Sequence, residues 1–317
     1  MTEFKETELD ERAIKMAKVL SADAVEKAGS GHPGSPISLA PVAYTLYQHF
    51  IKHDPNDPNW EGRDRFILSG GHASLTQYVQ LYFSGYGVTL DDLKHFRGGA
   101  DTRTPGHPEY GLTPGIEMTT GPLGQGISSA VGMALAESML AARYNTPEHT
   151  VVDHHTYVFT GDGCLMEGVS HEACSLAGTW GLGKLIALYD SNGISIDGKI
   201  DGWFNEDVAG RFRAYHWQVI GPINGHDAAA LDAAIAEAKA DHSRPSLIIC
   251  RTHIGFGSPK ADSASCHGSP LGDDGIAATR AALGWNEEPF TVPQELYSAW
   301  DAREKGKAAE AAWEHTY

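Results

Sequence analysis

Cysteine is scarce in this chain of 317 residues, and its four cysteines (Cys164, Cys174, Cys250 and Cys266) show no C-x-x-C spacing. That spacing is typical of zinc and redox motifs, so we expect no zinc site and a reduced, cytoplasmic protein. The segment Met1 to Asp10 is charged and lacks an apolar core, which predicts no secretory signal peptide. No apolar run approaches the length of a membrane span, so we expect no membrane partner.

Positive charge is also in short supply: 24 Lys and Arg stand against 41 Asp and Glu, for a formal net charge of −17. Nucleic acid needs a basic surface and is therefore excluded as a partner. A phosphorylated ligand stays open, because a metal, histidines and backbone N–H groups can meet its charge locally. The sequence has no G-x-x-x-x-G-K-[ST], no G-x-S-x-G and no H-E-x-x-H, which excludes a P-loop, a hydrolase elbow and a zincin site.

Apolar, strand-like runs alternate with helix-like segments along most of the chain. This alternation predicts an α/β fold with a parallel sheet and helices on both faces. Thr7 with Asp10 resembles a capping box that opens a helix, and Asp273 is expected to cap another. The segment from Gln294 to Tyr317 is helical in pattern but polar. The expected strands are 65–68, 156–160, 185–189, 217–220 and 246–251.

Asp162 lies between two glycines directly after one apolar run, and Asn192 follows the next run. A helix-like segment from Leu165 to Thr179 separates the runs, and the carboxyl ends of neighbouring parallel strands converge in space. The carboxylate, the amide oxygen and a main-chain carbonyl at Ile194 would form half an octahedron of hard ligands for Mg²⁺ or Ca²⁺, with a diphosphate supplying the rest. The alternative is that Asp162 and Asn192 are only turn residues.

Four histidines, His32, His72, His107 and His267, each stand beside a glycine, which places them on loops. If several converge on one site, they suit proton transfer near neutral pH; singly, each is a surface or capping histidine.

The glycine-rich segment Gly121 to Gly126 opens a helix whose free N–H groups can bind an anion, although a plain tight loop explains it equally well. Glu167 and Glu172 follow Asp162, and their pattern alone does not distinguish them from solvated glutamates.

Taken together, these segments resemble the diphosphate-binding, N-terminal domain of the transketolase family. The matching stretches run in order across nearly the whole chain, so the series is far more specific than any one motif. They are Ser30 to Pro36, Asp64 to Ser74, Thr104 to Glu109, Thr119 to Gly126, Gly161 to Gly168, Ser170 to Gly178, Asn192 to Phe204 and Ile254 to Pro259.

The resemblance implies a thiamine diphosphate-binding fold over residues 1–290, with 291–317 as the start of a helical interdomain connector. It implies thiamine diphosphate held through Mg²⁺ (or Ca²⁺), with Asp162, Asn192 and the Ile194 carbonyl as metal ligands. It also assigns His72, Gly121, Pro122, Leu123, Gly163, Asn192 and His267 to the cofactor, and His32, His107 and His267 to the sugar. Glu167 matches a position through which the family couples two active sites.

The implied activity is transfer of a two-carbon ketol unit from a ketose phosphate to an aldose phosphate, as in the pentose phosphate pathway. Family members usually carry two further domains, and the middle one provides the pyrimidine site and the activating glutamate. We therefore expect a split enzyme, with a second chain carrying the pyrimidine-binding domain and an assembly of two copies of each chain. Ser191, where relatives often carry Asp, and the loop from Lys260 to Cys266 depart from the family pattern.

Two alternatives stay open. The chain could serve another thiamine diphosphate enzyme, such as a 1-deoxyxylulose-phosphate synthase or a 2-oxo acid dehydrogenase. It could also be a non-catalytic or truncated module.

Overall fold

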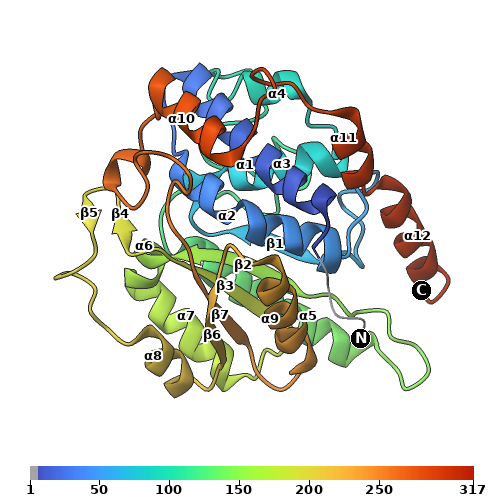
Figure 1. The fold of residues 1–317 in the computed structure, drawn as a ribbon. Coiled ribbons are helices and arrows are strands. Elements are labelled where there is room, and N and C mark those ends of the chain that lie inside the picture. The colour runs from blue at the N-terminus through green and yellow to red at the C-terminus, as the bar shows by residue number, and fades with distance from the viewer. Residues whose placement is uncertain (1–5) are drawn as a thin grey trace.

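The computed structural model describes residues 6–317 and confirms the predicted α/β architecture. A five-stranded parallel sheet in the order β1-β2-β3-β7-β6 forms its centre (Figure 1). A two-stranded antiparallel hairpin, which the sequence analysis missed, follows β3. The strands are β1 (Arg65–Leu68), β2 (Thr156–Gly161), β3 (Leu185–Ser191), β4 (Ile194–Ser195), β5 (Gly198–Lys199), β6 (Gln218–Asn224) and β7 (Ser246–Arg251).

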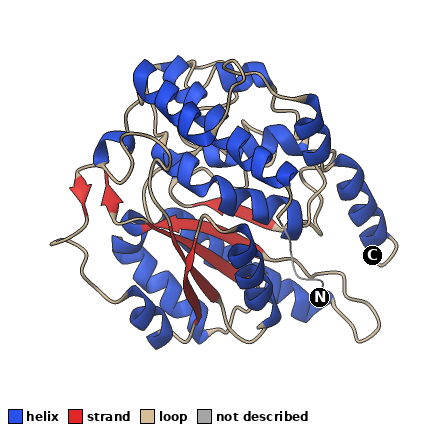
Figure 2. Cartoon of the chain, viewed as in Figure 1, coloured by secondary structure: helices blue, strands red, loops and turns tan. Residues whose placement is uncertain are grey.

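Helices cover both faces of the sheet (Figure 2), as the strand composition requires. Every residue of β3 is buried, which is possible only when neither face is open to water. One face packs on α5 (Gln125–Tyr144), α7 (Gly168–Thr179) and α8 (Val208–Ala214). The other packs on α2 (Gly34–Thr45) and α9 (Ala228–Ala240).

A further layer of helices surrounds a separate apolar cluster beyond α2. The helices of this layer are α1 (Glu8–Ala28), α3 (Leu75–Ser84), α4 (Leu90–Lys94), α10 (Asp273–Leu283) and α11 (Gln294–Trp300). The predicted capping box is confirmed, since the Thr7 hydroxyl accepts from Asp10 N–H and the Asp10 carboxylate accepts from Thr7 N–H. The prediction that Asp273 caps α10 is wrong. Gly272 occupies the cap with a φ of 81°, and Asp273 is the first helical residue.

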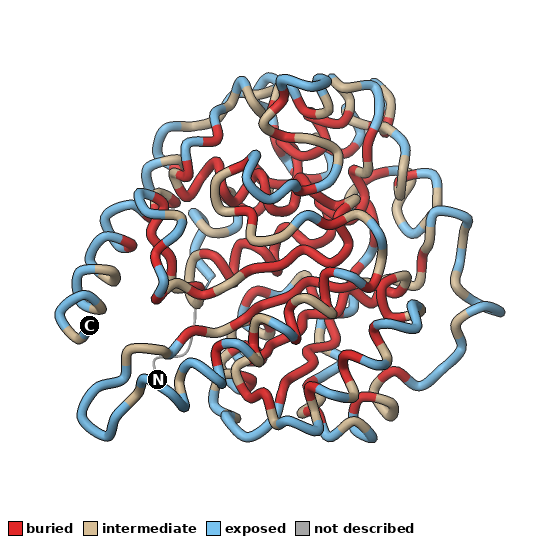
Figure 3. The backbone as a smooth tube through the Cα atoms, turned by 180° about the vertical axis from the view of Figure 1, so that it is seen from behind, coloured by how far each residue is buried: buried red, intermediate tan, exposed pale blue. Residues whose placement is uncertain are grey.

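The predicted helical segment at 294–317 is two helices, because the backbone is extended at Asp301. α11 contributes Trp300 to the core, where its ring stacks on Phe83 with centroids 4.2 Å apart. α12 (Arg303–Glu314) is largely exposed (Figure 3), and Trp313 Nε1 ties it to the Val151 carbonyl at 2.8 Å. The domain boundary at 290/291 stays a prediction.

Among residues 6–317, no helix is both long and apolar enough to cross a bilayer. The four cysteines, all in this range, are buried and free. Within the same range, no three His, Cys, Asp or Glu side chains form a group that could hold a metal. A cation site in this part of the chain would therefore draw on amide or main-chain oxygens.

Candidate active site

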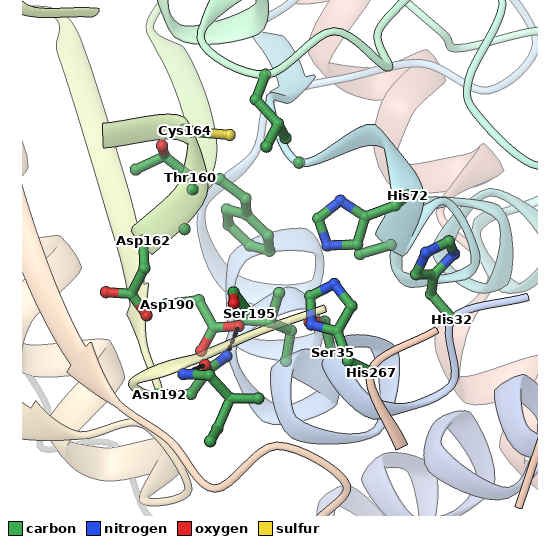
Figure 4. Close-up of a pocket in the computed structure, with 18 of the residues that line it drawn as sticks. His32, Ser35, His72, Thr160, Asp162, Cys164, Asp190, Asn192, Ser195 and His267 are labelled. Carbon is green, nitrogen blue, oxygen red and sulfur yellow. Dashed lines mark hydrogen bonds between the residues drawn. The ribbon is translucent and has the colours of Figure 1, made fainter. Parts of the chain in front are cut away.

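A cavity of about 240 Å³ opens at the carboxyl edge of the sheet, beside the ends of β1, β2 and β3. After β1 the chain turns toward the α2 face, and after β2 it turns toward the α7 face. Open α/β sheets bind ligands where neighbouring strand ends diverge in this way. Of the predicted site residues, the cavity is lined by His32, His72, Leu123, Gly163, Asp162, Asn192, Ile194 and His267 (Figure 4).

Asp162 is the first residue of α6 (Asp162–Met166), directly after β2. Its carboxylate is buried and accepts hydrogen bonds from the Tyr189 hydroxyl and from Gly193 N–H, the latter at 3.0 Å. Burial raises the pKa of Asp162 despite these donors. Because Gly193 immediately follows Asn192, the expected meeting of the two strand ends is confirmed.

Asn192 closes a tight turn in which its Oδ1 accepts from Ile194 N–H at 2.9 Å. Its Nδ2 donates to Asp190 Oδ2 at 3.0 Å, which fixes the orientation of the amide (Figure 4). Asp190 is fully buried and also accepts from the Thr252 hydroxyl. Burial, followed by the neighbouring Asp162 carboxylate, raises the pKa of Asp190 to about 7.

The sequence analysis missed two residues here: it treated Tyr189 as the end of an apolar run, and it assigned Asp190 to nothing. No local pattern in the sequence could have found them, because their place follows from the strand register: Thr160 pairs with Tyr189, and Gly161 pairs with Asp190. Residues at those pairing positions necessarily lie next to Asp162.

The donor set at this edge fits a divalent cation that also binds a diphosphate. It offers one carboxylate, one amide oxygen and the main chain at Ile194, all hard oxygen ligands. Such a set leaves several coordination positions of an octahedral ion for phosphate oxygens. Gly163 supports this fit, since a Cβ there would come within 3.0 Å of Leu123 and narrow the cavity.

Three of the four predicted histidines converge on the opposite side of the cavity from Asp162 (Figure 4). The ring centroids are 5.0 Å apart for His32 and His72, 5.6 Å for His32 and His267, and 5.0 Å for His72 and His267. Burial, and then the charge of neighbouring His267, lowers the pKa of His32 to about 4 and that of His72 to about 3. Both imidazoles are therefore neutral at pH 7. His267 Nδ1 is buried and has no hydrogen-bond partner within residues 6–317.

His107 is exposed and lies outside the residues that line the cavity, although its ring is about 3.5 Å from the position of a Cβ on Gly121. Burial, followed by the positive charge of Arg97, lowers the pKa of His107. Arg97 also approaches His32, with Nη2 3.4 Å from Nδ1. The sequence analysis missed Arg97, because its position follows from a left-handed backbone at φ 59° that only the fold defines.

The glycine-rich segment begins α5 as predicted, with Gly124 at the N-cap and a φ of 81°. A Cβ on Gly126 would lie 2.4 Å from the Ser69 backbone, so only glycine lets α5 approach the end of β1 this closely. Leu123 lines the cavity, whereas Gly121 and Pro122 lie just outside its lining.

Glu167 is exposed and breaks the predicted helix into α6 and α7, because its backbone is extended. It lies against Gly124, on the side of the sheet where α5 and α7 pack together. The outer surfaces of these two helices expose large apolar side chains. They are Met139, Leu140, Tyr144, Val169, Leu176 and Trp180.

Comparison with known proteins gives a consistent result. The family described as "Transketolase, thiamine diphosphate binding domain" matches residues 9–317. The chain is 58% identical over 301 residues to Transketolase 2 of Escherichia coli (strain K12), covering 95% of this chain and 45% of that protein. It is 59% identical over 301 residues to Transketolase 1 of Vibrio cholerae, with the same coverage.

Solved structures agree. A transketolase from Leishmania mexicana superposes with a TM-score of 0.94 at 45% identity, over 97% of this chain and 46% of that one. A transketolase from Pichia stipitis in complex with sedoheptulose-7-phosphate superposes with a TM-score of 0.95 at 44% identity, over 98% and 46%. The chain thus spans a little under half the length of the curated relatives and structures it matches.

Proposed function

Because this chain belongs to the family of transketolase thiamine diphosphate binding domains, we propose that it is the diphosphate-binding half of a transketolase. The proposed reaction moves a two-carbon ketol unit from a ketose phosphate to an aldose phosphate, in the pentose phosphate pathway of the cytoplasm. The observation that carries the proposal is one cavity that Asp162 and Asn192 line on one side and three histidines line on the other.

Asp162, Asn192 and the Ile194 carbonyl would hold Mg²⁺ (or Ca²⁺), and His72, Gly121, Pro122, Leu123, Gly163 and His267 would contact the cofactor. Thiamine diphosphate, when bound, supplies a carbon nucleophile for the ketose carbonyl. The protein's part is to fix the diphosphate through the cation and to exclude water with the buried walls of the cavity. The hard oxygen donors and the narrow wall at Gly163 support this assignment.

His32, His107 and His267 would contact the sugar and move protons on and off its hydroxyl oxygens. A neutral imidazole can both donate and accept, which suits a group that protonates one oxygen and deprotonates another. The lowered pKa values of all three histidines support this role. The buried, unpartnered Nδ1 of His267 supports it further, since residues 6–317 offer that atom no partner and a ligand would.

The complementary region would provide the pyrimidine site, and we propose that a second chain carries it, in a dimer of two such heterodimers. The exposed apolar face of α5 and α7 supports a large interface, because apolar patches of this kind mark protein contacts. Glu167 stands at the edge of that face, which suits its proposed coupling of two sites across the assembly.

The test combines this chain with a pyrimidine-binding half, thiamine diphosphate and Mg²⁺, and measures two-carbon transfer between sugar phosphates. We expect turnover with both halves present, its loss on chelation with EDTA, and its return with added Mg²⁺. Turnover of pyruvate instead would identify another thiamine diphosphate enzyme. No cofactor binding by the assembled protein would contradict the proposal and leave a non-catalytic module.

A further inference from the structure

The Tyr189 hydroxyl is the only side-chain donor to the Asp162 carboxylate among the hydrogen bonds of residues 6–317. Tyr189 lies near the end of β3 and pairs with Thr160 of β2, two residues before Asp162. Its ring is buried in the apolar cluster beneath α7, with only 4% of its surface exposed. The ring therefore has one position, and its hydroxyl is held against the carboxylate.

In this hydrogen bond the Tyr189 hydroxyl is the donor and Oδ1 of the Asp162 carboxylate is the acceptor. The phenol therefore fixes the direction of that carboxylate oxygen.

The remaining hydrogen bond of the carboxylate comes from the backbone, since Gly193 N–H donates to Oδ2 at 3.0 Å. A carboxylate has about four lone-pair sites, so these two donors, one on each oxygen, leave sites free for a cation.

We propose that Tyr189 is a positioning residue whose hydroxyl orients Asp162 so that one carboxylate oxygen is presented to the divalent cation. This inference rests on the proposed function, because it requires Asp162 to be a metal ligand. Mg²⁺ demands near-ideal octahedral geometry, whereas Ca²⁺ accepts six to eight ligands in flexible arrangements. Loss of the hydroxyl should therefore weaken Mg²⁺ binding more than Ca²⁺ binding.

The test uses Tyr189→Phe in the assembled protein. Calorimetry measures the binding of Mg²⁺ and of Ca²⁺ in titrations at saturating thiamine diphosphate. Removing a residue that orients a metal ligand typically costs 10- to 100-fold in affinity, so we expect the apparent Kd for Mg²⁺ to rise about 10-fold and that for Ca²⁺ clearly less. Tyr157→Phe is the matched control, since Tyr157 is equally buried in the sheet but its hydroxyl accepts from Lys239 instead. We expect it to bind both cations as the unsubstituted protein does.

The possible results distinguish a failure of the role of Tyr189 from a failure of the proposed function. If the unsubstituted protein shows no cation-dependent cofactor binding, the proposed function fails and the role of Tyr189 fails with it. If Asp162→Ala abolishes that binding while Tyr189→Phe matches Tyr157→Phe, only the positioning role is overturned. An equal loss for Mg²⁺ and Ca²⁺ would also overturn it, because a general loosening of the sheet does not discriminate between cations.

Discussion

The two edges of the central sheet differ in how they hold charged side chains. At the amino edge the chain forms ion pairs with its own groups: Lys184 Nζ contacts both buried Glu137 and exposed Asp153. Asp64, just before β1, accepts the main-chain N–H groups of Lys52 and His155 at 2.8 and 2.7 Å. These contacts join the strand starts to the neighbouring loops, and they occupy the polar groups that could otherwise bind a ligand.

At the carboxyl edge, Asp162 and Asp190 are as deeply buried, yet neither makes an ion pair with any of residues 6–317. Their donors are hydroxyls, an amide and backbone N–H groups, and the Asp162 carboxylate raises the pKa of Asp190. An uncompensated pair of buried carboxylates is costly for a fold, and a bound cation removes that cost. The contacts at the amino edge therefore stabilise the fold, whereas the carboxylates at the carboxyl edge are suited to a bound cation.

The largest effect should come from Asp162→Ala at the carboxyl edge. We expect cofactor affinity at a fixed Mg²⁺ concentration to fall at least about 100-fold, because the proposed carboxylate ligand is lost. Thermal stability of the cofactor-free protein should hold or rise, since a buried carboxylate without a cation partner is removed. Calorimetry measures both quantities, with exposed Asp201→Ala as the control. A lower Tm with unchanged cofactor affinity would show that Asp162 stabilises the fold, and it would contradict a role for Asp162 in binding.

Asp64→Ala is the converse substitution at the amino edge. It leaves two partly buried N–H donors without an acceptor, so we expect the free energy of unfolding to fall by about 2 kcal/mol. Urea denaturation gives this value, and cofactor affinity of the folded protein should not change. Weakened cofactor binding in Asp64→Ala would contradict the proposal that charges at the amino edge only stabilise the fold.

His107→Ala tests whether function extends past the lining of the cavity. We expect kcat/KM for sugar phosphates to fall about 10-fold, the loss of one hydrogen bond, with cofactor affinity kept. His149→Ala is the control, because His149 is exposed on the loop that leads to the amino edge. Selective loss of cofactor binding in His107→Ala would contradict its assignment to the sugar.

The smallest effect concerns α12, which packs at the amino edge. Its Glu310 lies near other acidic side chains and is not paired with a positive charge among the ion pairs of residues 6–317. Burial and the nearby carboxylates of Asp54, Asp57 and Glu314 raise the pKa of Glu310 to about 7. An acid whose pKa is higher when docked binds its proton more tightly in the docked state, so docking weakens as the pH rises toward that pKa. The helix α12 should therefore be held more tightly at pH 6 than at pH 8.

Hydrogen exchange of residues 303–317, corrected for the intrinsic effect of pH, measures the docking of α12. Glu310→Gln should remove the pH dependence, whereas Glu304→Gln, exposed on the same helix, should keep it. A pH response that survives in Glu310→Gln would rule out this carboxyl as its source.

The sequence predicted the carboxyl edge better than the contacts that support it. Asp162 and Asn192 were identified because glycines and apolar runs mark strand ends, and parallel strands bring those ends together. Tyr189 and Asp190 were missed because their roles depend on the register between β2 and β3, which no local pattern encodes. Arg97 was missed for a similar reason, as only the packed loop gives its backbone a positive φ.

Other differences have equally local causes. The hairpin of β4 and β5 has strands of two residues, too short for any periodicity to register. Glu167 interrupts a helical pattern because the backbone extends there, beside Gly124, before α7 begins. The cap at Gly272 displaced the expected one at Asp273, since the Gly272 N–H bonds to Glu26 of α1.

The apolar surface of α5 and α7 also has a consequence for anyone who purifies this chain without a covering partner. Copies are kept apart at pH 7 by like-charge repulsion, since the formal charge is −17. That repulsion disappears near the isoelectric point of about 5.3 and is screened by salt at any pH. We therefore expect the isolated chain to precipitate in mildly acidic buffers and in ammonium sulfate, and to keep best in dilute, slightly alkaline solution.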